Sequence, residues 1–130
     1  MPREWVGTQM ISALIVCATL SVVDGDTIKC DGQNMRLLGE GVVNVRGVDT
    51  PEIGRGAKCQ KERKMAQLAK FRLQEMIEGK KLRIEAKGKD RYGRPLVNVY
   101  LPNGREVGKE LIREGFAREW RKGNKIDWCR

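Results

Sequence analysis

The sequence contains no histidine. Histidine is the usual general base near neutral pH, the usual partner of a catalytic serine or cysteine, and the commonest ligand of catalytic zinc. Its absence argues against all three kinds of active site. Any hydrolytic chemistry in this chain must therefore rely on carboxylates, arginines and a hard metal cation.

Long apolar segments are also scarce. One apolar run, Met10 to Leu20 (MISALIVCATL), is too short to span a bilayer but long enough for the core of an export signal. Against an export signal, Arg3 is offset by Glu4, and no small-residue cleavage site stands out. We interpret residues 1–17 as an N-terminal apolar segment, the remnant of an export signal. We expect a secreted or periplasmic protein with no membrane contact in its mature form, and a cytoplasmic location is the alternative.

The size and charge of the chain indicate a single-domain protein with a basic surface. A length of 130 residues is enough for one domain with one core. Lys and Arg number 26 against 17 Asp and Glu, which gives a net charge of +9. Such an excess favours a polyanionic partner, with nucleic acid first and an anionic membrane second. Solubility alone is the plainer explanation of the same charge.

The pattern of β-forming runs and turns predicts the fold class. Two Asp-Gly pairs, Asp24-Gly25 and Asp31-Gly32, separate three short runs within residues 18–38 and predict a three-stranded meander. A fourth strand is expected over residues 42–48. Apolar residues at spacings of three and four predict a helix over residues 57–78. Strands at 81–87 and 94–100 and a short helix from Val107 complete a small β-barrel with helices packed on it.

Two acidic clusters are candidates for chemistry. In the first, Asp24 suits a turn, whereas Asp26 opens a strand, where acidic residues are depleted. In the second, Asp49-Thr50-Pro51-Glu52, the proline ends a strand, so nearby carboxylates and carbonyls can face outward. A plain turn is the alternative there. Two carboxylates and a backbone carbonyl suit a hard cation such as Ca²⁺.

The third cluster is Lys89-Asp90-Arg91-Tyr92-Gly93-Arg94. It is compatible with a solvated turn between two strands. It also combines a guanidinium suited to phosphate, Arg94, with an aromatic face suited to a base or sugar, Tyr92.

In their order, these motifs resemble the staphylococcal nuclease (thermonuclease) family. The resemblance rests on VVDGDTIK, RLLG, VDTPE, a Cys-x-x-Glu helix, DRYGRPL and NGREVGKELIREGFA, and it covers residues 18–120. It implies a five-stranded OB-fold barrel and a Ca²⁺-dependent nuclease acting on DNA or RNA. We expect a monomer in which residues 121–130 form a C-terminal tail, because the long C-terminal helix of the family has no room after Gly123.

The resemblance also assigns roles to individual residues. Asp26 and Asp49 match the metal-binding carboxylates, and the Thr50 carbonyl matches the backbone ligand. Glu52 matches the glutamate that activates or orients the attacking water. The phosphate and nucleotide contacts fall on Arg94, Arg91 and Tyr92.

The second phosphate arginine departs from the family pattern. The family places this arginine five residues before the second aspartate, where this sequence has Asn44. Either Arg36 is the equivalent and residues 40–47 are an insertion, or Arg46 substitutes for it. We prefer Arg36, because the Asp31-Gly32 hairpin places it on the third strand of the meander. A family aromatic near the site is replaced by Arg121.

Two alternatives come from other functional classes. One is a noncatalytic OB-fold nucleic-acid-binding module, which we expect to have lost the acidic residues that this chain keeps. The other is a disulfide-stapled exported domain with an incidental basic surface, which leaves the acidic motifs unexplained. The four cysteines fit no zinc motif, and their pairing cannot be read from spacing. From the family's barrel we expect a Cys30–Cys59 disulfide, with buried free thiols as the alternative.

Overall fold

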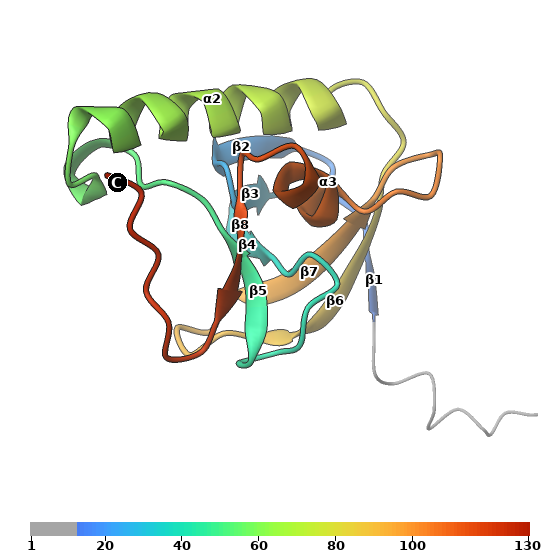
Figure 1. The fold of residues 1–130 in the computed structure, drawn as a ribbon. Helices are drawn as coiled ribbons and strands as arrows, with labels where there is room; N and C mark the ends of the chain where they lie inside the picture. Colours follow the sequence, from blue (N-terminus) through green and yellow to red (C-terminus); the bar gives the residue numbers. More distant parts are fainter. Residues whose placement is uncertain (1–12) are drawn as a thin grey trace, which may run out of the picture.

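A computed structural model describes residues 13–130 (Figure 1). The strands and helices follow the order that the sequence pattern predicts, with additional short elements. The elements are β1 (Ala13–Ile15), β2 (Leu20–Asp24), β3 (Thr27–Cys30), β4 (Gln33–Leu37), β5 (Arg46–Asp49), the 3₁₀ turn η1 (Gly54–Gly56), α2 (Gln60–Ile77), β6 (Arg83–Lys89), β7 (Pro95–Tyr100), α3 (Val107–Arg113) and β8 (Arg118–Arg121).

The predicted meander is confirmed as β2, β3 and β4, which pair antiparallel. Asp31 and Gly32 both have positive φ, which a two-residue type I′ hairpin turn requires. The other turn is less regular, because the pairing of β2 with β3 shifts register between Val22 and Asp24. A bulge of this kind re-aims nearby side chains, and here it lies two residues before Asp26.

The sheet closes on itself in the manner of an OB-fold barrel. Its order is β1-β6-β7-β4-β3-β2, and β4 pairs with β7 in parallel while the other pairs are antiparallel. β1 and β2 are consecutive in the chain and lie at the two ends of this order, so they are two halves of one bent strand. Counted in this way, five strands form the barrel, and the predicted fold class is confirmed. A separate pair, β5 with β8, lies beside it.

The long helix covers one opening of the barrel and contributes to its core (Figure 1). Its buried apolar residues recur at helical spacing, and they pack with buried residues of the sheet. The helix begins at Gln60 rather than at residue 57, because Cys59 is extended and its Sγ accepts a hydrogen bond from the Glu62 amide. Glu106 caps α3 through a hydrogen bond from the Lys109 amide.

The strand expected over residues 42–48 is shorter than predicted. The chain turns tightly instead, with the amides of Val45 and Arg46 both donating to the Val42 carbonyl. Asn44 adopts a positive φ, which a continuous strand does not allow. β5 therefore starts at Arg46 and pairs with β8.

Two disulfides join Cys17 to Cys30 and Cys59 to Cys129, so the expected Cys30–Cys59 bridge is wrong. Cys30 ends β3 opposite Leu20, and the adjoining Asp31 carboxylate accepts from the amides of residues 18 and 19, which brings Cys17 close. Cys59 is instead bonded to Cys129, in the segment that follows β8.

The two terminal segments are tied to the barrel. Within the apolar run, Ala13–Ile15 forms β1 and pairs with β6, whereas residues 1–12 of the expected export-signal remnant lie outside the described residues. Residues 122–130 form turns and extended chain that return from β8 to the start of α2 (Figure 1). Of the helices between residues 13 and 130, none has the length and hydropathy needed to cross a membrane.

Candidate active site

Asp26 lies in the turn between β2 and β3 and is 5% exposed. Its Oδ1 accepts a hydrogen bond from Thr27 Oγ1 at 3.0 Å. Its Oδ2 accepts one from the amide of the buried Thr50 at 3.4 Å. This second contact joins the first acidic cluster to the segment that follows β5, as the sequence analysis expects for a shared site.

The Arg36 guanidinium links the two candidate metal carboxylates. Arg36 extends from β4, and its Nη2 lies 3.4 Å from Asp26 Oδ2 and 3.8 Å from Asp49 Oδ1. The same nitrogen donates to the Val48 carbonyl at 3.1 Å. One cation from the third strand of the meander therefore partly neutralises acids from two other segments of the chain.

The carboxylates around this guanidinium influence one another electrostatically. Burial raises the pKa of Asp49, and the nearby Asp26 raises it further. Burial, Asp26 and Asp49 likewise raise the pKa of Glu52. Burial and the adjoining Asp26 raise the pKa of Asp24 to about 7, so this residue belongs to the acidic cluster as well as to its turn. Such a surplus of negative charge favours the binding of a cation.

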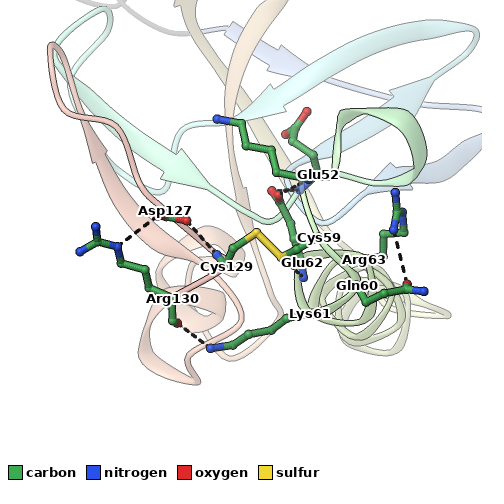
Figure 2. Close-up of a disulfide and its surroundings, with 10 residues drawn as sticks. Glu52, Cys59, Gln60, Lys61, Glu62, Arg63, Asp127, Cys129 and Arg130 are labelled. Atoms are coloured by element: carbon green, nitrogen blue, oxygen red, sulfur yellow. Dashed lines mark hydrogen bonds and ion pairs between the residues drawn. A yellow bond between two sulfur atoms is a disulfide. The ribbon is translucent and has the colours of Figure 1, made fainter.

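Glu62 anchors the loop that carries Glu52. It is 4% exposed, and its two carboxylate oxygens accept from the amides of Glu52 and Lys58, each at 2.9 Å. Figure 2 shows Glu62 beside Glu52 at the start of α2. Glu62 belongs to the Cys-x-x-Glu motif at the start of α2, and the motif alone does not indicate this anchoring role.

The basic cluster lies on the turn between β6 and β7. Asp90 organises it, because its carboxylate accepts from the amides of Tyr92 and Arg94 and pairs with Arg94 Nε at 2.7 Å. The ring of Tyr92 is 70% exposed, and the guanidinium carbons of Arg91 and Arg94 lie 5.0 and 5.7 Å from its centroid.

A groove of about 710 Å³ runs between this turn and β5. Arg36 lies on its wall, so the groove adjoins the acidic pair. Its cationic and aromatic lining comes from Arg36, Arg46, Arg91, Tyr92, Arg94, Trp120 and Lys122.

The two candidate second arginines lie in different places. Arg36 contacts Asp26 and Asp49, whereas Arg46 pairs with Glu119 of β8 at 3.9 Å. Both line the groove. β5 begins only at Arg46, after the tight turn, and pairs with β8 from that residue on, which explains why Arg46 lies opposite β8.

Trp128, from the C-terminal tail, also reaches the acidic pair. Its indole Nε1 donates to Asp49 Oδ2 at 3.2 Å. No local sequence pattern predicts this contact, because it joins residues 79 positions apart.

The donor atoms present fit a hard cation. Across residues 13–130, no three acidic or cysteine side chains converge into a ready metal cage. Asp26 and Asp49 offer carboxylate oxygens, and Thr50, whose amide donates to Asp26, follows Asp49 in the chain. An all-oxygen donor set of this size suits Ca²⁺ or Mg²⁺, which complete their coordination with water and substrate.

Comparison with protein families gives a match over most of the chain. The family described as "Staphylococcal nuclease homologue" matches residues 42–127, which include β5, α2, the basic turn and β8. The chain belongs to this family.

Two curated relatives extend the staphylococcal nuclease comparison. A protein of Haemophilus influenzae named "Uncharacterized endonuclease" is 29% identical over 101 residues, which cover 78% of this chain and 50% of that protein. The succinoglycan biosynthesis protein ExoI of Rhizobium meliloti is 33% identical over 97 residues, covering 75% of this chain and 48% of that protein. The chain thus spans about half the length of these curated relatives.

Replacing Glu62 tests how the Glu52 loop is held in this staphylococcal nuclease homologue. In Glu62→Ala two part-buried amides lose their acceptor, and we expect a loss of about 2–4 kcal/mol in the free energy of unfolding. Hydrogen exchange at the amides of Glu52 and Lys58 should accelerate as well. Urea unfolding and exchange monitored by NMR measure both effects.

The control is Glu75→Ala on the same helix, where the side chain is 70% exposed and pairs with Arg72 at 3.6 Å. A surface pair of this kind contributes less than about 1 kcal/mol. Equal stability losses in the two variants, with unchanged exchange at Glu52, would contradict the anchoring role of Glu62.

Proposed function

We propose that the chain is a metal-dependent nuclease that hydrolyses phosphodiester bonds in DNA or RNA. The observation that carries this proposal is the position of Arg36. Its guanidinium lies between the carboxylates of Asp26 and Asp49 and on the wall of a groove rich in arginine. A phosphate in that groove would meet several guanidinium groups, one of which, Arg36, contacts the acidic pair.

In this proposal Asp26, Asp49 and the Thr50 carbonyl hold Ca²⁺. Support comes from the oxygen-only donor set and from the raised pKa of Asp49, which reflects burial and the nearby Asp26 carboxylate. When bound, the cation supplies positive charge that offsets the charge developing on the phosphate oxygens.

The side chains around the metal site carry the remaining chemistry. Glu52 orients the attacking water or accepts its proton, a role for which the chain offers no histidine. Arg36 and Arg94 donate hydrogen bonds to the phosphate oxygens as charge builds on them. Asp90 holds Arg94 through its Nε, which leaves the two terminal nitrogens of the guanidinium for this contact.

Arg91 and Tyr92 are proposed to contact the neighbouring nucleotide. The exposed ring of Tyr92 offers a stacking face, and Arg91 Nη2 donates to the Tyr92 hydroxyl at 2.8 Å, which orients the pair. Stacking and phosphate contacts of this kind tolerate many sequences. We therefore expect little base specificity.

Two disulfides are compatible with an oxidising compartment, since such bonds persist mainly in secreted and periplasmic proteins. We propose a secreted or periplasmic nuclease that acts as a monomer.

A cleavage assay on single- and double-stranded DNA and RNA tests the proposal. We expect cleavage with added Ca²⁺, loss of cleavage with chelator, and a dissociation constant for Ca²⁺ alone of order 10⁻⁴–10⁻³ M, because the protein supplies few ligands. Glu52→Gln and Arg94→Ala should each lower the rate about 10²–10³-fold while the fold stays intact.

The control for loss of a positive charge is Arg113→Ala. Arg113 lies on α3, where it pairs with Glu110, and it does not line the groove. Cleavage that persists in chelator, or wild-type rates in Glu52→Gln, would contradict the proposal. Nucleic-acid binding without cleavage would instead support a noncatalytic OB-fold module.

The choice between the two candidate arginines has its own test. Arg36→Lys should lower the cleavage rate far more than Arg46→Lys, because lysine cannot reproduce a bidentate guanidinium contact. Arg46→Lys should mainly weaken substrate binding at the far end of the groove. Steady-state kinetics on one oligonucleotide compare the two variants, and a larger loss in Arg46→Lys would show that Arg46 is the catalytic partner.

A further inference from the structure

The C-terminal tail brings a single buried donor to the candidate metal site. Trp128 is 5% exposed, and its indole N–H, the one polar group of the side chain, donates to Asp49 Oδ2 at 3.2 Å. The other oxygen, Asp49 Oδ1, lies on the Arg36 side at 3.8 Å. Each oxygen of the Asp49 carboxylate therefore has its own partner: the Trp128 indole contacts Oδ2, and the Arg36 guanidinium contacts Oδ1.

The indole is held by its surroundings. Arg118 of β8 places its guanidinium carbon 4.6 Å from the Trp128 ring, and Arg118 is the residue paired with Asp49 between β8 and β5. The paired strands β5 and β8 thus carry both groups that contact the indole, the Asp49 carboxylate and the Arg118 guanidinium.

A covalent link fixes the next residue. Cys129 is bonded to Cys59, the N-cap of α2, across 70 residues of sequence. A hydrogen bond also joins the tail to this region, since Lys61 Nζ donates to the Arg130 carbonyl at 2.6 Å (Figure 2). Within the tail, the Asp127 carboxylate accepts from the Cys129 amide at 3.0 Å. Residues 124–127 lack regular structure, so the disulfide supplies a fixed point beside Trp128.

We propose that Trp128 is a positioning residue for Asp49 and that the Cys59–Cys129 disulfide holds it in place. The inference rests on the proposed function, in which Asp49 binds the metal. The indole N–H fixes the orientation of the carboxylate, as partners of metal-binding groups do. Because Cys59 also begins the helix that carries Glu62, one disulfide connects the metal carboxylate with the Glu52 loop.

The test compares Trp128→Phe with the wild type. Phenylalanine keeps an aromatic ring but loses the N–H donor. Loss of such a partner typically weakens metal affinity about 10–100-fold, so we expect the Ca²⁺ dissociation constant, measured by calorimetry without substrate, to rise by at least about tenfold. Excess Ca²⁺ should restore much of the kcat, which a general loss of folded protein would not allow.

The disulfide arm uses two matched variants. In Cys59→Ser/Cys129→Ser the serine hydroxyl at position 59 can still cap α2, and we expect weaker Ca²⁺ binding, as in Trp128→Phe. In Cys17→Ser/Cys30→Ser, which removes the other disulfide, the Ca²⁺ affinity should stay at the wild-type value even if the protein is less stable. Adding Trp128→Phe to the first variant should weaken binding little further, because the two changes act through one contact.

The indole signal in ¹⁵N NMR spectra reports the contact without reference to activity. Trp128 is identified as the signal lost in Trp128→Phe, and we expect it to shift in Asp49→Ala and in Cys59→Ser/Cys129→Ser but not in Cys17→Ser/Cys30→Ser. A Trp128 indole signal whose chemical shift is unchanged in Asp49→Ala would overturn the inference.

The possible failures are distinguishable. Equal or tighter Ca²⁺ binding in folded Trp128→Phe, with a wild type that binds Ca²⁺ and cleaves nucleic acid, overturns the positioning role alone. A wild type that neither binds Ca²⁺ nor cleaves overturns the proposed function and this inference together.

Discussion

The contact of one guanidinium with two carboxylates organises the site. Asp26 comes from the turn after β2, Asp49 from the end of β5, and Arg36 from β4, and the three meet within 3.8 Å. Placing acids together in a partly buried pocket is unfavourable unless positive charge compensates them. Arg36 compensates them in part, and burial leaves the pKa of both Asp49 and Glu52 raised. In the proposed function, a metal cation supplies the further positive charge.

The barrel and the Cys59–Cys129 disulfide position the residues that make this contact. The bulge in β2 and the parallel pairing of β4 with β7 set Asp26 and Arg36 at one end of the barrel. Glu62 then fastens the Glu52 loop to α2, and the Cys59–Cys129 bridge returns the tail to the same helix end. The contacts at the start of α2 therefore both stabilise the fold and position the residues of the site.

Local signals in the sequence account for much of the fold. The Asp-Gly turns predicted the meander, and the apolar spacing predicted α2 to within three residues at its start. The resemblance to the staphylococcal nuclease family led to Asp26, Asp49 and Glu52. The features that the resemblance did not predict are mainly contacts between residues far apart in the sequence. The disulfide partner of Cys59 lies 70 residues away in the sequence, and Trp128 contacts Asp49 across 79 residues. The turn at Asn44 requires a positive φ, whereas the valines on either side of Asn44 favour a strand.

A crystal structure of the protein grown with calcium chloride would show whether the two aspartates bind Ca²⁺, because the anomalous signal of calcium locates the ion independently of activity. We expect a Ca²⁺ ion with carboxylate oxygens of Asp26 and Asp49 in its coordination sphere, at about 2.3–2.6 Å. We also expect Arg36 to turn from the carboxylates toward the groove. Arg36 lodged between the two aspartates, with no ion beside them at a calcium concentration that supports cleavage, would contradict the proposed metal site.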